Sequence, residues 1–256
     1  MTLLRCEGLT VRFGGLLALD RLDLELAAGE ILGLIGPNGS GKTTFFNALT
    51  GLYRAAAGRA RFDDHELTGM SPQRIYAAGI TRTFQRSRLA LPLSVFDNIM
   101  IGNHRRLRHG LWFNLFRRNA LRAELEANVE KARLLVGTFN RELVSQIFEP
   151  VARLPMIDRR RIEICRALVS APRLLLLDEP SAGMTHEETR ELMDDILLVR
   201  ERLAGLSIVI IEHEMNVIER VSQRCAVLNY GRKIAEGSYA QVAADREVQT
   251  AYLGTD

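Results

Sequence analysis

The sequence contains few cysteines, few lysines and no long apolar run. Its three cysteines, Cys6, Cys165 and Cys225, are widely spaced, and none has a His or Cys neighbour at metal-ligand spacing. This pattern argues against a cysteine-ligated metal site, so we expect three buried apolar side chains. No apolar run approaches the ~18 residues of a membrane span, and the N-terminal residues lack a signal-peptide core. We therefore expect a cytoplasmic protein.

Positive charge is carried almost entirely by arginine. Of 34 lysines and arginines, only Lys42, Lys131 and Lys233 are lysines, so the place of each lysine is informative. The formal net charge of +3 is too small to indicate nucleic acid as a partner. The chain has 256 residues, of which 47% are hydrophobic and 25% charged. These values are typical of a globular protein with a sizeable core, in one large or two small domains.

Strand and helix patterns alternate along most of the chain. Residues 22–26 alternate with period two, as in a half-buried strand, whereas residues 31–35 are continuously apolar, as in a strand buried on both faces. Further strands are predicted at 58–62, 80–84, 173–177, 207–211, 224–229 and 232–236. Helices are predicted at 41–52, 94–101, 119–136, 156–170, 186–204 and 238–247. This alternation favours a mainly parallel sheet covered on both faces, interrupted by a helical insertion.

The strongest chemical signal is GPNGSGKTT, which follows the buried strand and opens a helical pattern. Its glycines let the backbone wrap around a phosphate, with N–H groups and a helix N-terminus directed at the negative charge. Lys42 would neutralise the β- and γ-phosphates, and the hydroxyl of Thr43 would bind Mg²⁺. We expect the whole stretch to bind the nucleotide: Gly36, Pro37, Asn38, Gly39, Ser40, Gly41, Lys42, Thr43 and Thr44.

A second signal is the run LLLLDEP, in which two carboxylates follow four apolar residues. A buried strand that ends in Asp178 and Glu179 would place both at the ligand-binding edge of an α/β sheet. Asp178 can hold Mg²⁺ through water or Thr43, and Glu179 can orient and polarise the attacking water.

Two further polar residues follow strand patterns. His213 comes after the apolar run at 207–211, which predicts an imidazole at the same sheet edge. Gln85 follows the strand-like residues 80–84 and suits an amide that contacts metal and water. A surface or helix-capping histidine and an ordinary loop glutamine are the alternative interpretations.

These motifs, in this order and spacing, resemble the ATP-binding subunits of ABC transporters over nearly the whole chain. The resemblance implies that residues 36–44 are the Walker A loop that binds ATP and that Asp178 is the Walker B aspartate for Mg²⁺. It also implies that Glu179 is the catalytic glutamate, Gln85 the Q-loop glutamine and His213 the switch histidine.

Other stretches carry finer resemblances. Phe13, in VRFGG, occupies the place of the aromatic residue that stacks on adenine in the family; a core phenylalanine of an N-terminal strand is the alternative. The stretches RFGGLLALD, TRTFQ and AGMT, the basic insertion after Asn98 and the ending AYLG resemble the ATPases of branched-chain amino acid importers. Importers of urea or short amides share much of this pattern.

The resemblance also implies an α/β fold of the P-loop NTPase type found in ABC ATPases. We expect a core with a mainly parallel sheet, an N-terminal antiparallel β subdomain and an inserted helical subdomain. The predicted division places residues 1–86 and 171–256 in the core and residues 87–170 in the helical subdomain.

The chain departs from the family at the signature, a turn that typically reads LSGGQ or LSYGQ and approaches the partner subunit's ATP. Aligned on RRRIEICRAL, this chain has Leu154-Pro155-Met156-Ile157-Asp158 there. Pro155 lacks the hydroxyl and a backbone donor, and we expect Met156 and Ile157 to crowd the approach. We expect Asp158 to bring negative charge near phosphate. The helix itself should survive, with one apolar face made of Ile162, Cys165, Leu168 and Val169.

The altered signature predicts an asymmetric pair with a second, different ATPase chain whose signature is intact. That partner would complete the ATP site of this chain, while the partner's own ATP would turn over slowly or not at all. The alternative is that backbone N–H groups beyond Pro155 suffice.

Residues 104–122 are rich in arginine and aromatic residues, and no acidic residue occurs between Asp97 and Glu124. Such a stretch can rest on anionic lipid headgroups or grip nucleic acid. A solvated helix face is the plain alternative.

Two classes of function remain open. In the first, ATP hydrolysis drives solute import together with transmembrane permease subunits and, indirectly, a solute-binding protein, at the inner face of the plasma membrane. In the second, the chain is a nucleotide-binding regulatory or structural partner with little turnover. Intact Glu179 and His213 favour the first class, and the altered signature favours the second. An ABC-type ATPase acting on DNA or ribosomes lacks support because no long coiled coil or tandem insertion is present, so we expect no nucleic acid partner.

Overall fold

The computed structural model describes residues 1–104 and 118–253. Two compact units form. The first contains Met1–Gln85, Arg173–Ala182 and Arg200–Asp256, and the second contains Arg86–Pro172 and Gly183–Val199. The domain boundaries drawn from the sequence stay a prediction.

A six-stranded sheet forms the centre of the first unit, in the order β10-β9-β3-β8-β7-β6. Its strands are β3 (Ile31–Ile35), β6 (Ile80–Arg82), β7 (Leu174–Asp178), β8 (Ser207–Ile211), β9 (Arg224–Asn229) and β10 (Arg232–Gly237). All neighbouring pairs are parallel except β9 and β10, which form an antiparallel hairpin. Every residue of β3, β7 and β8 is buried, as continuous apolar runs predict. The predicted mainly parallel sheet is confirmed.

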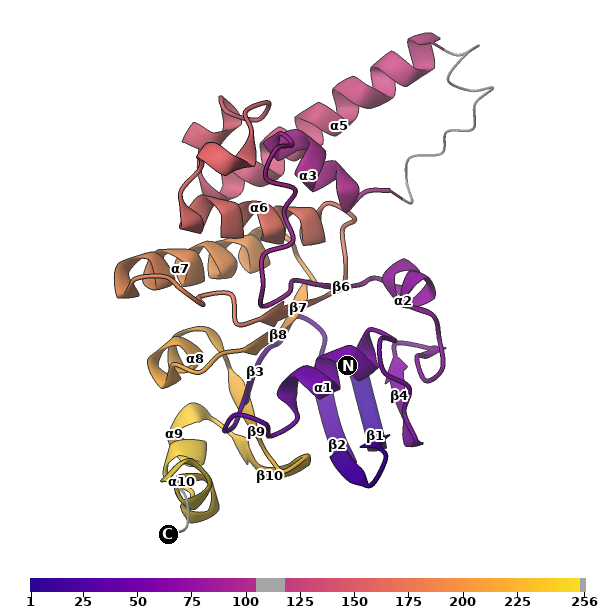
Figure 1. Cartoon of the computed structure of the whole chain (residues 1–256), viewed down its shortest axis with the longest axis vertical. Helices are drawn as coiled ribbons and strands as arrows, with labels where there is room; N and C mark the ends of the chain where they lie inside the picture. The colour runs from indigo at the N-terminus through magenta and orange to yellow at the C-terminus, as the bar shows by residue number, and fades with distance from the viewer. Residues whose placement is uncertain (105–117, 254–256) are drawn as a thin grey trace. The chain divides into compact units, whose positions relative to one another are not determined.

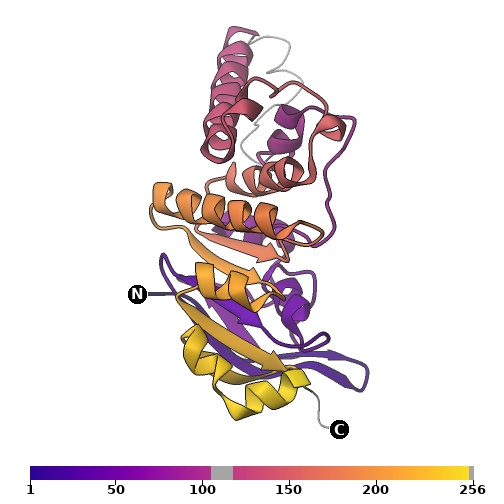
Figure 2. The ribbon, with the colours of Figure 1, turned by 90° about the vertical axis from the view of Figure 1, so that its left-hand side faces the viewer.

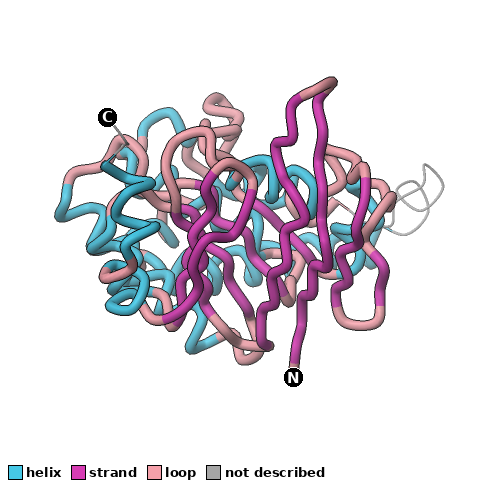
Figure 3. Tube along the Cα trace, turned by 90° about the horizontal axis from the view of Figure 1, so that it is seen from below, coloured by secondary structure: helices cyan, strands magenta, loops and turns pink. Residues whose placement is uncertain are grey.

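A second, antiparallel sheet of four strands lies in the same unit, in the order β2-β1-β4-β5. It contains β1 (Thr2–Phe13), β2 (Leu16–Ala27), β4 (Ala57–Phe62) and β5 (His65–Glu66). Figure 3 follows β1 from the N-terminus to the tip of the β1–β2 hairpin. Alternate residues of β2 face the core, including Leu22, Leu24 and Leu26. The predicted N-terminal antiparallel sheet is therefore present.

Helix α1 (Lys42–Leu49) packs against β2 (Figure 1). Its Phe45 and Phe46 side chains are buried in the core of this unit. Two short helices, α2 (Pro72–Ala78) and α8 (Met215–Val221), were not predicted by the sequence pattern. Each has only seven residues, too few for a 3.6-residue period to stand out.

The single helix predicted at 238–247 is wrong. Two helices occupy the C-terminal region, α9 (Tyr239–Ala243) and α10 (Arg246–Leu253). The carboxylate of Asp245 accepts hydrogen bonds from the N–H groups of Glu247 and Val248, which ends one helix and starts the next. Figure 2 shows both helices beside strands β9 and β10.

The second unit is mainly helical. It contains α3 (Val95–Ile101), α5 (Arg118–Phe139), the short 3₁₀ helices η1 (Glu142–Val144) and η2 (Val151–Arg153), and α6 (Met156–Leu168). Helix α7 (His186–Arg202) begins in this unit. The predicted apolar face of α6 is buried at all four positions, Ile162, Cys165, Leu168 and Val169. Most of the basic stretch predicted at 104–122 lies outside the described residues.

The three cysteines are buried and unpaired in the described part of the chain, as predicted. Across residues 1–104 and 118–253, every helix is too short or too polar to cross a membrane.

Candidate functional site

The loop between β3 and α1 has a backbone that only glycine allows at its first position. Gly36 has φ 143°, and a Cβ atom there would lie 2.1 Å from the carbonyl oxygen of Leu228. The turn between β9 and β10 supports the other end, because the Gly231 N–H donates to the Ser40 carbonyl at 2.9 Å. The phosphate-binding loop is therefore built against the β9–β10 hairpin.

Lys42 begins α1 and turns its side chain back into this loop. Its Nζ donates to the carbonyl oxygens of Gly36 at 2.6 Å and Pro37 at 3.0 Å. Burial lowers the pKa of Lys42, and the charges of Glu179 and Asp178 oppose that shift. The ammonium group of Lys42 is thus held between the phosphate-binding loop and the carboxylates of Asp178 and Glu179, where a bound phosphate would lie. Thr43 is exposed beside it on the first turn of α1.

Asp178, at the carboxyl end of β7, is 1% exposed and pairs with an arginine that is 5% exposed. The Nη2 of Arg82 donates to Asp178 Oδ2 at 2.5 Å. The other oxygen, Oδ1, has no hydrogen-bond partner among the described residues. Burial raises the pKa of Asp178, and the hydrogen bond from Arg82 opposes the rise.

These donors suit a hard divalent cation. An orphaned carboxylate oxygen on Asp178 and the exposed hydroxyl of Thr43 are the oxygen ligands that Mg²⁺ prefers. No group of three or more His, Cys, Asp or Glu side chains forms a metal cage within the described residues. A Mg²⁺ ion bound here would therefore depend on nucleotide oxygens and water for its remaining ligands.

Glu179 is held from both sides by two residues from the segments that follow strands β6 and β8. Gln85 Nε2 donates to Glu179 Oε2 at 2.5 Å, and His213 Nε2 lies 2.5 Å from Glu179 Oε1. Since an ionised carboxylate only accepts, Nε2 of His213 is the donor. The backbone of Glu179 has φ 48°, an uncommon left-handed conformation for a side-chain-bearing residue. The structure brings together three residues that the sequence predicted separately.

Glu212 is a buried acid of this site that the sequence interpretation missed. Its Oε1 accepts a hydrogen bond from the N–H of Ser181 at 2.9 Å, which ties β8 to the loop after Glu179. Burial raises the pKa of Glu212, and the hydrogen bond from Ser181 opposes the rise. The signal in the sequence is the position of Glu212 directly after the apolar run at 207–211 and before His213.

Arg82 is the second missed residue. It is the second residue of TRTFQ, and the signal was a charged residue inside an otherwise strand-like segment. A charge in that position needs a buried partner, which the sequence does not name.

Phe13 lies at the hairpin end of β1 and is 46% exposed, so it is not a core phenylalanine. Its ring meets that of Tyr53 edge to face, with centroids 5.0 Å apart. An exposed aromatic face is what adenine stacking requires, and that role stays a prediction.

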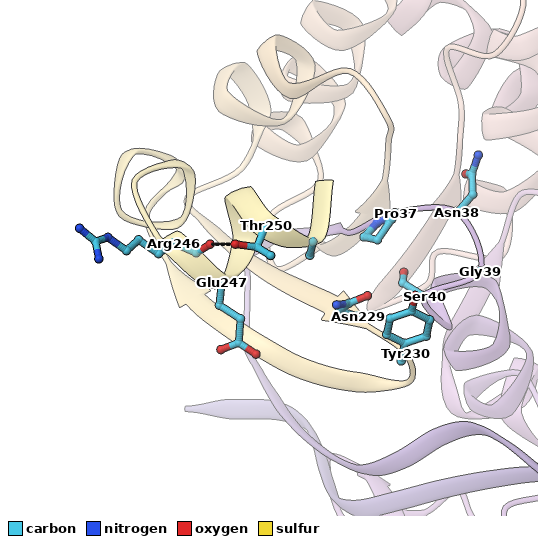
Figure 4. Close-up of a pocket in the computed structure, with 10 residues that line it drawn as sticks. Pro37, Asn38, Gly39, Ser40, Asn229, Tyr230, Arg246, Glu247 and Thr250 are labelled. Atoms are coloured by element: carbon cyan, nitrogen blue, oxygen red, sulfur yellow. Dashed lines mark hydrogen bonds between the residues drawn. The ribbon is translucent and has the colours of Figure 1, made fainter. Parts of the chain in front are cut away.

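A pocket of about 450 Å³ adjoins the phosphate-binding loop (Figure 4). Its lining residues come from the loop, from the β9–β10 turn and from α10, and include Asn38, Tyr230 and Thr250. Burial raises the pKa of Tyr252 on the same helix, and the nearby Gly36 backbone opposes that rise. Helix α10 therefore contacts the loop that would hold the nucleotide.

The divergent signature turn, in the second unit, differs from expectation in two ways. Met156 is 47% exposed, but Ile157 is only 7% exposed, so Ile157 packs inward and does not crowd the surface. The carboxylate of Asp158 accepts from Arg161 at 2.9 Å and from Asn140 at 3.3 Å. The expected free negative charge at this turn is therefore wrong, because Asp158 is buried and paired. The surface of the turn is made by Pro155 and Met156.

The family is decided by comparison with known proteins. Residues 19–182 match the family model described as ABC transporter. The chain belongs to the ABC transporter family of ATP-binding proteins. A second model, described as branched-chain amino acid ATP-binding cassette transporter, matches residues 232–256.

Curated relatives and solved structures agree with this ABC family membership. The chain is 37% identical over 98% of both chains to the high-affinity branched-chain amino acid transport ATP-binding protein LivG of Escherichia coli. It is 36% identical over the same shares to BraF of Pseudomonas aeruginosa. The ADP conformation of the ATP-binding cassette MJ1267 superposes with a TM-score of 0.85, 29% identity and full coverage of both chains.

Membership identifies this ABC protein as a transport ATPase that binds nucleotide. It is an importer subunit that dimerises and works with transmembrane permease subunits.

Proposed function

We propose that this ABC ATPase powers the import of branched-chain amino acids or related small polar solutes. The E. coli and P. aeruginosa relatives are branched-chain amino acid transport proteins by name, and both align over nearly the whole chain. Selectivity in such a transporter depends on other subunits, so urea or short amides stay possible cargoes. The protein would lie on the inner face of the plasma membrane, bound to the permease subunits.

The observation that supports a hydrolytic role is the double hydrogen bonding of Glu179 by Gln85 and His213. Both contacts fix the carboxylate, so it can direct a water molecule at the terminal phosphate and accept the proton of that water. Lys42 and the N–H groups of the glycine-rich loop stabilise the phosphate charge. Mg²⁺, held by Thr43 and Asp178 with Gln85 nearby, would neutralise further charge on the β- and γ-phosphates.

The test is Glu179→Gln, which keeps the shape of the side chain but removes its charge and replaces one acceptor oxygen by an NH2 donor. We expect the rate of ATP hydrolysis to fall by about 10²- to 10³-fold while ATP binding persists. The assay uses the chain paired with an ATPase subunit that carries an LSGGQ-type signature. Unchanged hydrolysis would reject Glu179 as the catalytic base.

We further propose that the active dimer is asymmetric and that the partner is a different chain with an intact signature. Pro155 and Met156 make the surface of the signature turn, and neither offers the hydroxyl that a phosphate contact needs. ATP bound to this chain would be hydrolysed, whereas ATP bound to the partner would be held. A homodimer of this chain that hydrolyses ATP at the rate of the mixed pair would contradict asymmetry.

The second candidate function is a nucleotide-binding regulatory or structural subunit. The exposed Pro155-Met156 tip favours it, because a homodimer would contain two such tips. Glu179→Gln distinguishes the two functions when this chain is paired with the different ATPase subunit. The variant stops solute uptake if ATP hydrolysis by this chain drives transport, and it leaves uptake unchanged if this chain is a regulatory subunit.

A further inference from the structure

Arg82 is a buried arginine that joins three segments of the nucleotide site. Its Nη2 donates to Asp178 Oδ2 at 2.5 Å, and its Nη1 donates to Asn47 Oδ1 at 2.6 Å on α1. The guanidinium carbon lies 5.3 Å from the ring centre of Phe46 and 5.1 Å from that of Phe84. One side chain thus contacts the end of β7, the helix after the phosphate-binding loop and the segment that leads to Gln85.

These contacts fix the guanidinium in position. Its planar fork has donors in fixed directions, and the carboxylate and the amide each take one arm. The two aromatic rings add cation–π contacts and limit movement of the plane. A lysine would offer a single ammonium group and could not reproduce this geometry.

The two oxygens of the Asp178 carboxylate have different surroundings in this arrangement. Oδ2 is taken by Arg82, while Oδ1 is buried and without a hydrogen-bond partner in the described residues. A buried acceptor left unpaired costs free energy, so an orphan at a strand end beside a phosphate loop points to a ligand. Lys42 is near enough to interact electrostatically with this carboxylate.

The main chain of Asp178 is anchored by the neighbouring residue. Its N–H donates to Thr83 Oγ1 at 3.3 Å, and the Thr83 N–H donates to the Leu176 carbonyl at 2.9 Å. Adjacent residues of one segment therefore hold the side chain and the backbone of the same aspartate. Such outer contacts orient metal-facing ligands in many proteins.

We propose that Arg82 is a positioning residue for the cation site: it anchors Oδ2 of Asp178 and so directs Oδ1 toward the Mg²⁺ of Mg-ATP. This inference rests on the proposed function, in which Asp178 is the carboxylate that faces the metal. Arg82 touches neither nucleotide nor metal and acts through Asp178 alone.

The experiment compares the affinity for ATP in Mg²⁺ with the affinity in EDTA, measured by calorimetry on the full chain. In the wild type, the ratio of the two affinities reports the contribution of the metal. We expect Arg82→Met to reduce that ratio by about 10- to 100-fold, the range typical for loss of an outer contact to a metal ligand. Affinity in EDTA should change little, because the phosphate-binding loop is intact. Arg82→Lys should give a smaller loss.

Arg173→Met is the matched control. Arg173 also pairs with an aspartate, Asp63, at 2.6 Å and also lies over an aromatic ring, that of Phe62, but at the start of β7. We expect this variant to keep the wild-type ratio, so a general effect of removing a paired arginine is excluded.

Folding is checked by thermal unfolding in EDTA without nucleotide. If Arg82→Met does not fold, Arg82→Lys and Asn47→Ala carry the test, since Asn47→Ala removes one anchor of the guanidinium. An unchanged or increased ratio in a folded Arg82 variant would overturn the proposal, because Arg82 would then be only structural or would compete with the metal.

Asp178→Asn separates this failure from failure of the proposed function. If Asp178→Asn lowers the ratio of ATP affinities in Mg²⁺ and EDTA but the Arg82 variants keep the wild-type ratio, only the positioning role of Arg82 is overturned. If Asp178→Asn also keeps the wild-type ratio of ATP affinities in Mg²⁺ and EDTA, Asp178 does not face the metal. The positioning role of Arg82 and the proposed metal-binding role of Asp178 are then both overturned.

Discussion

Arg161 donates to the carboxylate of Asp158 at 2.9 Å, from one turn further along α6. The same guanidinium donates to Glu191 and to Asp195 on α7 at 2.5 and 2.8 Å. Asp158 thus belongs to an ion-pair cluster inside the second unit, in which Glu191 is exposed and the other members are largely buried. Arg161 joins α6 to α7, and Pro155 and Met156 make the exposed tip of the turn.

This division predicts which part of the signature can be restored. Pro155→Ser with Met156→Gly changes only the surface of the turn, and serine at the helix N-cap is favourable by about 1 kcal/mol. If the tip is what limits hydrolysis, ATPase activity of the homodimer should rise by at least about tenfold, since one donor to a phosphate-like charge contributes that much or more. The readout is phosphate release.

Ile157→Ala is the contrasting variant. Because Ile157 is buried, this change should lower the free energy of unfolding by about 2 kcal/mol or more and should not raise activity. If Pro155→Ser with Met156→Gly folds but gives no increase, the turn is not what limits the homodimer.

Asp195 predicts a pH dependence of stability. Burial raises its pKa from 3.8 to about 6, the negative charges of Glu191 and Asp194 add to the rise, and the hydrogen bond from Arg161 opposes it. A raised carboxyl pKa means that its stabilising contribution is present below pH 3.8 and is lost as pH rises through about 6. Asp195→Asn lacks this titration. Its stability relative to the wild type should therefore increase from about pH 4 to pH 7, by about 3 kcal/mol at most.

Urea unfolding followed by circular dichroism at several pH values measures this difference for Asp195. A flat difference between Asp195→Asn and the wild type would mean that the pKa is not raised.

The contact between α10 and the phosphate-binding loop gives a further prediction. Tyr252→Phe removes the hydroxyl that lies near the Gly36 backbone but keeps the ring. A neutral hydrogen bond contributes about 1 kcal/mol, so the Kd for ATP should rise by about fivefold. Tyr76→Phe on α2 is the control, since Tyr76 does not line the pocket beside the loop and its loss should leave the Kd unchanged. Equal effects of the two variants would argue against a specific role for Tyr252.

The site could be predicted from sequence wherever its chemistry lies in one continuous stretch. Residues 36–44 follow a buried strand, and Asp178 and Glu179 end another, so each motif and its structural context are adjacent in the chain. The positions of Gln85 and His213 followed from the rule that parallel strands end at one sheet edge. Short-range patterns of this kind also determined the central strands and the apolar face of α6.

Other features were decided only by the tertiary structure. Arg82 and Asp178 are 96 residues apart, and their contact arises because β6 pairs with β7. Likewise, the charge of Asp158 is paired with Arg161, its carboxylate accepts a hydrogen bond from Asn140, and Ile157 turns inward on the helix. A sequence motif specifies which groups are present, but burial and pairing set their charge and exposure. Those depend on neighbours that only the packed fold supplies.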